Sequence, residues 1–405
     1  MDVMPILSAL KRNKVGAVLI ALQLALTLAI VSNALFIISQ RLSYVSRPTG
    51  VIESDLVVLN NNFIGQDLDY KPLLDEDLAT LRAVPGVVDA FASNSVPLSN
   101  GGWSTGVNLS QKQERSTAQT TIYFGDDHSV NTYDLKLVAG RNFTSDEITT
   151  FSRNDTLQPP VVIMTQQLAK KVFPDGDAVG KQIYLSENAT PTTIVGVVER
   201  LQTPWVGRWA DEFWESSTIV PHHYLGRGQR YVLRTEPGRS DEVMKAALAA
   251  LVKVNPARVN DTNRPFHEYR AEAYRGDRAM AIMLTTVCVA LLAITALGIV
   301  GLASFWVTQR RKQIGTRRAL GATRGAIVRY FQLENALITA GGAVVGVALA
   351  VGLNVWMVST FQLTRLNLWY LPIGVAIVFV LGQLAVFTPA RRAATVPPAE
   401  ATRSV

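Results

Sequence analysis

Long apolar segments alternate with polar ones along this chain of 405 residues. A helix needs about 17–25 mostly apolar residues to cross the hydrocarbon core of a bilayer, and four segments reach that length. The first follows Lys11, Arg12 and Lys14, and a long polar stretch separates it from the other three. The pattern predicts transmembrane helices within residues 15–38, 279–307, 327–358 and 371–387.

The polar stretch, residues 42–277, mixes short alternating or β-branched segments with amphipathic helical ones, which is typical of an α+β domain. A unit of strands and one helix over residues 55–92 recurs over residues 217–254, with Ser217–Val220 as one of its strands. Between the two units, residues of about 95–215 have strand and turn signals of their own. We therefore predict an α-helical membrane protein with four transmembrane helices plus an α+β two-lobed domain, whose second lobe is inserted into the first.

Positive charge is concentrated beside the apolar segments. Residues 42–276 hold 23 Lys and Arg and 28 Asp and Glu, and since the whole chain has 39 and 32, the remaining residues hold 16 and 4. Basic residues are enriched on the cytoplasmic side of membrane proteins. This distribution predicts cytoplasmic termini and an outer polar domain, and it argues against a nucleic-acid partner.

The predicted boundaries are 1–41 for the N-terminus and first helix, 42–277 for the outer domain, 278–308 for the second helix, 309–326 for a cytoplasmic connection, 327–358 for the third helix, 359–370 for an outer loop, 371–390 for the fourth helix and 391–405 for a cytoplasmic tail.

No motif in the sequence indicates an enzyme. A P-loop needs Gly, four residues, then Gly-Lys and Ser or Thr to hold phosphates, whereas Gly176–Gln182 has a shorter spacing and ends in Gln. His222 and His223 are adjacent and have no further ligands at the spacing of a metal site. We therefore expect a non-catalytic membrane subunit with no metal or cofactor of its own. The single Cys288 lies in a predicted membrane helix, so no disulfide is expected in the outer domain.

A basic segment, Gln309–Thr323, connects the second and third predicted helices. Its charges by themselves would only set the membrane topology. Its apolar residues and two glycines around a short helical turn would also let it present a surface to a partner. The candidate contact residues are Arg310, Arg311, Lys312, Gln313, Ile314, Gly315, Arg317, Arg318, Ala319, Leu320, Gly321 and Ala322.

This segment closely resembles the connection between the second and third membrane helices in ABC permeases of the MacB and FtsX superfamily. In the outer domain, Gly140-Arg-Asn-Phe143, Leu168–Pro174, Val179–Ile183 and Ile194–Val198 are similar to the periplasmic core domain of MacB-type permeases. Together the two resemblances cover nearly the whole chain. The sequence departs from the family at Gln313, where glutamate is usual, and at Thr316, where an aliphatic residue is common.

The resemblance implies a permease subunit in a bacterial inner membrane, with a periplasmic outer domain and a basic connection that carries ATPase motion into the membrane. Its expected partners are a cytoplasmic ABC ATPase dimer, which would hold ATP and magnesium, and a second permease copy or a sister permease. A periplasmic adaptor and an outer-membrane channel would complete an efflux system. The expected function is export of a periplasmic peptide, drug or lipid; lipoprotein release and FtsX-like signal transmission without transport are alternatives.

Three residues inside the third predicted helix are further candidates. Glu334 is an acidic residue in an apolar segment, where a charge is costly. One explanation is that Glu334 forms hydrogen bonds near the membrane interface, close to Arg329. The other is a role in packing or coupling, and the family resemblance supports this second explanation. Gly342 and Gly346 match the small-xxx-small pattern, which serves either packing within the chain or a dimer contact.

An aromatic cluster in the outer domain has spacing close to that of one helical face. We interpret it as a stripe of core residues. Because Pro204 and Gly207 interrupt the segment, the alternative is an exposed surface for a partner or apolar cargo. The cluster consists of Trp205, Trp209, Phe213 and Trp214.

Overall fold

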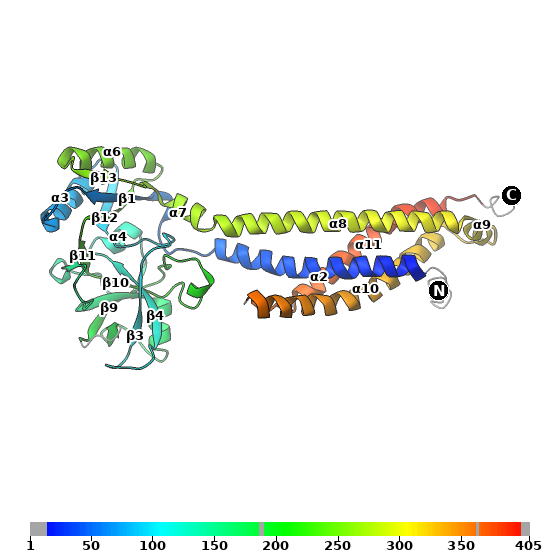
Figure 1. Cartoon of the computed structure of the whole chain (residues 1–405), viewed down its shortest axis with the longest axis horizontal. Coiled ribbons are helices and arrows are strands. Elements are labelled where there is room, and N and C mark those ends of the chain that lie inside the picture. Colours follow the sequence, from blue (N-terminus) through cyan, green and yellow to red (C-terminus); the bar gives the residue numbers. More distant parts are fainter. Residues whose placement is uncertain (1–13, 186–189, 362–363, 398–405) are drawn as a thin grey trace. The chain divides into compact units, whose positions relative to one another are not determined.

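The computed structural model describes residues 14–185, 190–361 and 364–397. Within this part of the chain, four helices are long and apolar enough to cross a membrane (Figure 1). The chain divides into two compact units, the membrane helices with their connections and an outer domain formed by Ser46–Gly276. The four helices are α2 (Lys14–Val45), α8 (Arg275–Gln309), α10 (Arg324–Phe361) and α11 (Tyr370–Ala394).

Helices α2 and α10 approach each other closely because glycines line α10 where the two helices meet. A Cβ atom on Gly342 would lie 2.7 Å from the carbonyl oxygen of Ala21, and one on Gly346 would lie 2.8 Å from Leu28 Cδ2. Both glycines therefore face α2 of the same chain. Helix α11 packs against α2 and α10, and α8 is joined to α2 by Thr27 and Thr295, whose hydroxyl oxygens are 2.8 Å apart.

The first lobe of the outer domain is an antiparallel sheet with the order β13-β1-β12-β2, in which β14 also pairs with β1. Its leucine-rich core lies between the sheet and two helices, α3 and α6. Along α3, Leu74, Leu78 and Leu81 recur at helical spacing and face this core. The elements are β1 (Leu56–Phe63), α3 (Tyr70–Arg82), β2 (Val87–Ala92), β12 (Gly228–Thr235), α6 (Ser240–Val254), β13 (Arg258–Asn260) and β14 (Arg264–Pro265). Helices α4 (Ser129–Tyr133) and α7 (Phe266–Ala273) also pack on this lobe.

The second lobe contains a seven-stranded sheet with the order β5-β9-β7-β10-β4-β3-β8, and an additional pairing of β8 with β9 closes it into a ring. Helix α5 packs against β4, β7 and β9. The elements are β3 (Trp103–Asn108), β4 (Ala118–Phe124), β5 (Leu137–Gly140), β7 (Val161–Thr165), α5 (Gln166–Val172), β8 (Gln182–Leu185), β9 (Thr192–Val198) and β10 (Ser217–Val220). A separate parallel pair is formed by β6 (Thr149–Ser152) and β11 (His222–Leu225).

The assignment of Ser217–Val220 to the first lobe is wrong. This strand, β10, pairs in parallel with β4 and antiparallel with β7, so it belongs to the second lobe. All four of its residues are buried. A strand that is covered on both faces has no polar alternation, so its sequence does not reveal which sheet it joins.

The aromatic cluster does not lie on a regular α-helix, because the only helical turn in this segment is the short 3₁₀ turn η3 (Arg208–Ala210). The rings of Trp205 and Trp209 are 5.1 Å apart and those of Trp209 and Phe213 are 5.5 Å apart. Phe213 is buried, whereas Trp209 is 60% exposed. The cluster is therefore part core and part surface.

His222 is expected to make the stability of the outer domain depend on pH. Its ring stacks on Phe151 at a centroid distance of 5.5 Å, and its Nδ1 lies 2.6 Å from Thr149 Oγ1. Burial lowers the pKa of His222 from 6.5 to about 4, against the opposing influences of a backbone hydrogen bond with Pro221 and of Asp155, while His223 acts in the same direction as burial. The unfolded chain therefore binds this proton at a higher pH than the folded domain does. The contribution of neutral His222 to the stability of the outer domain is therefore complete above pH 6.5, and it is lost as the pH falls toward 4.

Between pH 7 and pH 4, the wild type should lose about 3 kcal/mol more unfolding free energy than His222→Gln, because the glutamine cannot titrate. Urea unfolding of the full chain in detergent, followed by intrinsic fluorescence at both pH values, measures this difference. The variant keeps the contact between His223 Nε2 and Asp126, 3.2 Å apart, so other titrations cancel in the comparison. Equal losses in the two proteins would show that His222 is protonated equally in the folded and unfolded states.

Candidate functional site

The connection between α8 and α10 folds into a separate short helix, α9 (Arg311–Ala319). The amide of Ile314 donates to the carbonyl of Arg310, which starts the helix. At its end, the amide of Gly321 donates to Arg318 and the amide of Ala322 donates to Arg317. This is the pattern of a Schellman C-cap, and it requires the positive φ of 93° that Gly321 adopts. Gly321 thus fixes where α9 stops and the chain turns toward α10.

One face of α9 packs against the membrane helices. Ile314 is 5% exposed and belongs to the apolar cluster that contains Ile327 and Phe331 of α10, and Gly315 beside it is buried. From the same helix, Arg318 Nη1 donates to the carbonyl oxygens of Ala394 and Val396, at 3.1 and 2.8 Å. These carbonyls lie at the C-terminal end of α11, where a cation also complements the helix dipole. The inner face of α9 is therefore attached to two membrane helices.

Arg310, at the junction of α8 and α9, forms a buried ion pair with Glu334 of α10. Its Nη1 lies 2.9 Å from both carboxylate oxygens of Glu334, and the two side chains are only 10% and 2% exposed. The guanidinium also lies 5.8 Å from the ring centroid of Trp306. Arg329, which the sequence placed close to Glu334, is exposed. The sequence analysis missed this pair, because nothing in the spacing of residues 310 and 334 indicates a contact.

The opposite face of α9 is exposed. Leu320 is 83% exposed, so its apolar side chain is largely unpacked within the chain. Arg317 is exposed but stacks on Tyr330, with its guanidinium 4.7 Å from the ring centroid. The other exposed candidates are Arg311, Lys312, Gln313, Ala319 and Gly321, and Ala322 is half-buried. The structure thus separates the candidate residues into an inner attached set and an outer exposed set.

The remaining candidates also lie on α10. Gly342 and Gly346 are four residues apart and share one side of the helix, whereas Glu334, eight residues before Gly342, points to another side. Glu334 faces the α8–α9 junction, and the two glycines face α2. Helix α10 therefore connects the basic segment to the centre of the bundle.

Within the described residues, no group of three or more His, Cys, Asp and Glu side chains is arranged to hold a metal ion. His222 and His223 point to different partners, Thr149 and Asp126. The Gly176–Gln182 segment lies in the second lobe, where it follows α5 and ends at the first residue of β8. The arrangement around α9 is thus one of attachment on one face and exposure on the other.

Comparisons with known proteins agree on the family. Residues 17–251 match the MacB-like periplasmic core domain, and residues 285–398 match the FtsX-like permease C-terminal family. A macrolide export ATP-binding/permease protein MacB from Chromobacterium violaceum is 27% identical over 273 residues, which cover 66% of this chain and 40% of that protein. A second MacB protein, from Neisseria gonorrhoeae, is 24% identical, and the match covers 77% of this chain and 47% of that protein. The chain therefore spans less than half the length of either MacB protein.

The uncharacterized ABC transporter permease YknZ from Bacillus subtilis is 23% identical over 81% of this chain and 78% of that protein. Among solved structures, the extracellular domain of YknZ from Gram-positive bacteria covers 51% of this chain and all of that domain, with 17% identity and a TM-score of 0.33. The periplasmic region of MacB from Actinobacillus actinomycetemcomitans covers 57% of this chain and 97% of that region, with 14% identity and a TM-score of 0.36. On its match to the two family descriptions, the chain belongs to the family of ABC transporter permeases that have a MacB-like periplasmic core domain and an FtsX-like C-terminal region.

Proposed function

We propose that this permease transmits the motion of a cytoplasmic ABC ATPase dimer to its periplasmic domain and so drives the export of a periplasmic peptide, drug or lipid. ATP and magnesium would be held by the ATPase, on a separate chain. A second permease copy or a sister permease would complete the membrane unit, and a periplasmic adaptor with an outer-membrane channel would receive the cargo. Both termini would lie in the cytoplasm, in agreement with the basic residues beside the membrane helices.

The observation that carries this proposal is the division of α9 into an attached face and an exposed face. A partner that pushes on the exposed face would displace α9 as a unit. The displacement would reach α10 through Arg310 and Glu334, and it would reach α11 through Arg318. Such coupling needs rigid elements in contact with one another, and each of these contacts is a charge-assisted hydrogen bond.

Export is favoured as the outcome because the MacB relatives are named for macrolide export. Lipoprotein release and signal transmission to cell-envelope enzymes would use the same coupling element, so they differ from export in the periplasmic partner alone. The partner that co-purifies therefore decides between them.

Leu320→Asp should abolish recovery of the ATPase with the permease from native membranes. Leu320 is exposed, so the aspartate leaves the fold intact while it puts a charge into the centre of the proposed contact. A central apolar contact typically contributes about 2 kcal/mol or more, so the affinity should fall at least about 30-fold. The measurement is quantitative mass spectrometry of proteins that co-purify with the tagged full chain, together with ATP hydrolysis by the purified complex.

The matched control is Arg365→Glu, which changes an exposed residue in the connection between α10 and α11, at the other end of α10. It should leave ATPase recovery at the wild-type level. Recovery of an adaptor together with the ATPase would support export, whereas an ATPase with a lipoprotein or a wall hydrolase regulator would support the alternatives. Equal recovery from wild type and Leu320→Asp would refute the proposed contact.

A further inference from the structure

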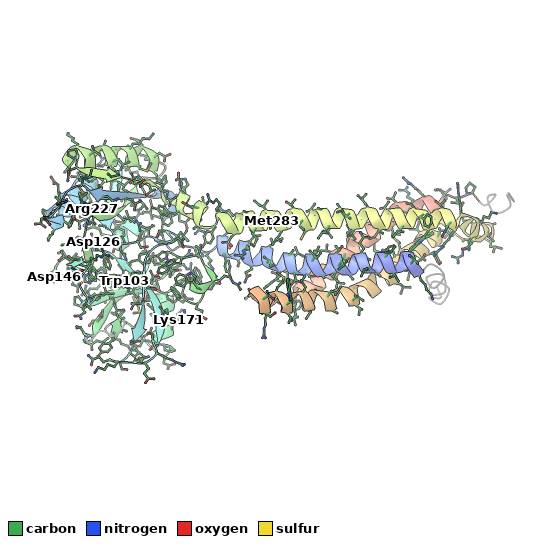
Figure 2. The ribbon with its side chains drawn as sticks, in the orientation of Figure 1. Trp103, Asp126, Asp146, Lys171, Arg227 and Met283 are labelled. Atoms are coloured by element: carbon green, nitrogen blue, oxygen red, sulfur yellow. The ribbon has the colours of Figure 1, made fainter. Side chains whose placement is uncertain are left out.

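A cavity of about 510 Å³ lies between the two lobes of the outer domain. Ligand pockets in proteins commonly have volumes of about 300–1,000 Å³. The first lobe contributes Asn60, Asn62 and Arg230 from neighbouring strands β1 and β12. The second lobe contributes Trp103, which Figure 2 labels, with Phe124 and the nearby Phe151. The cavity thus has one polar wall and one aromatic wall.

The aromatic wall is a packed cluster rather than a set of separate rings. Phe124 and Phe151 meet edge to face at 5.1 Å, and Trp103 lies 5.8 Å from Phe151 and 6.2 Å from Phe124. The two phenylalanines are buried, whereas Trp103 keeps 37% of its surface exposed. Trp103 therefore offers an apolar ring that is held in position by its neighbours, as is typical of a ring that stacks on a ligand.

The polar wall carries the positive charge of Arg230. Its Nε donates to Asn60 Oδ1 at 2.9 Å and its Nη1 donates to the carbonyl oxygen of Asn94 at 3.1 Å. Both acceptors are neutral, and in the described part of the chain no Asp or Glu lies within 4.0 Å of the guanidinium nitrogens. These two bonds use Nε and Nη1, which leaves Nη2 for a ligand. A charge that is oriented by neutral groups can still attract an anion.

Asn94 makes this wall rigid because it also joins the two lobes. Its side chain accepts from the amide of Phe124 at 2.8 Å and donates to the carbonyl of Ile122 at 3.1 Å. Arg230 is therefore held at a fixed place relative to the aromatic wall. Asn62 and Asp261 also line the cavity, and both are exposed. The acidic Asp261 would disfavour a second negative charge on the ligand, so a monoanion fits best.

We propose that this cavity binds a carboxylate-bearing amphiphile whose aromatic or aliphatic body stacks on Trp103 while its carboxylate meets Arg230. A guanidinium pairs with a carboxylate through parallel hydrogen bonds, and an apolar body gains free energy when the aromatic wall removes it from water. That such a ligand is the exported cargo rests on the proposed function. Its binding to the cavity does not, because binding requires neither ATP nor a partner protein.

The test uses two probes that differ only in charge, N-acetyl-diphenylalanine and its uncharged C-terminal amide. Each is titrated by equilibrium dialysis into the full chain in lipid nanodiscs, with empty nanodiscs as the reference for partition into lipid. We expect the acid to bind about 10–100-fold more tightly than the amide, since a hydrogen bond to a charged group contributes about 1.5–3 kcal/mol. Arg230→Gln should remove this preference and leave the affinity for the amide unchanged.

Two further variants separate the site from a general loss of structure. Trp103→Ala should weaken both probes by a similar factor, and Asn62→Asp, at an exposed position, should weaken only the acid. The matched control is Arg227→Gln, at an exposed arginine three residues before Arg230 that does not line the cavity, and it should change neither affinity. Equal affinities of the two probes in the wild type, or a preference for the acid that survives Arg230→Gln, would overturn the proposal. Neither result depends on ATPase recovery, so this proposal and the proposed function fail separately.

Discussion

Asp77→Asn is expected to destabilise the first lobe of the outer domain by about 3–5 kcal/mol. Asp77 lies on the buried face of α3 and receives both Nη1 and Nη2 of Arg258, at 2.9 and 2.8 Å. The two side chains are 1% and 0% exposed, and the hydroxyl of Tyr231 donates to the same carboxylate at 2.5 Å. Asparagine keeps the shape of the side chain but leaves the guanidinium of Arg258 buried without a counter-charge. The loss should therefore be that of a broken buried ion pair.

Hydrogen exchange of the full chain measures this effect, because the amides of α3 and β1 report the free energy of opening of this lobe. The matched control is Asp75→Asn, two residues earlier on α3. Asp75 pairs with Lys71 at 2.6 Å, but the two side chains are 48% and 57% exposed, so its loss should cost less than about 0.5 kcal/mol. The double variant Asp77→Leu/Arg258→Met should recover most of the stability, since apolar residues of similar size need no partner. A cost for Asp77→Asn no larger than that of Asp75→Asn would contradict the assignment.

The regular elements could be predicted where apolar residues recur with one clear period. The one helix expected in the unit over residues 55–92 is α3, Tyr70–Arg82, and the one expected in the unit over residues 217–254 is α6, Ser240–Val254. The strand Ser217–Val220 was predicted, but its sheet was not, because its partners are distant in sequence and it is buried on both faces. Periodicity gives the type of an element, whereas its neighbours are set by packing that one sequence does not express.

The candidate site could likewise be predicted only in part. The sequence indicated a basic segment with an apolar patch, but it gave no reason to treat its arginines differently. The structure buries Arg310 against Glu334, turns Arg318 toward carbonyls and leaves Arg311 exposed. These roles depend on the positions of Glu334 on α10 and of the C-terminal end of α11 relative to α9. The apolar patch also divides, because Ile314 is buried while Leu320 is exposed.

Glu334→Gln is expected to loosen α9 from the membrane helices. The variant leaves the guanidinium of Arg310 buried with a neutral partner, and breaking a buried ion pair in this way costs about 3–5 kcal/mol. Because the pair joins the α8–α9 junction to α10, the cost should appear as local opening of α9. A loss of about 3 kcal/mol corresponds to roughly 100-fold faster hydrogen exchange of the amides of residues 311–319. The measurement is hydrogen exchange with mass spectrometry on the full chain in nanodiscs.

Arg329→Met is the matched control, because Arg329 is an exposed arginine on the same helix as Glu334. It should leave the exchange of α9 unchanged. Arg310→Met should resemble Glu334→Gln, since it strands the carboxylate instead of the guanidinium, and the double variant Arg310→Met/Glu334→Leu should return exchange toward the wild-type rate. If α9 exchanges at the wild-type rate in both single variants, Ile314 and the bonds from Arg318 are sufficient to hold it. The ion pair would then orient Glu334 within α10, and the path from α9 into the bundle would run through α11.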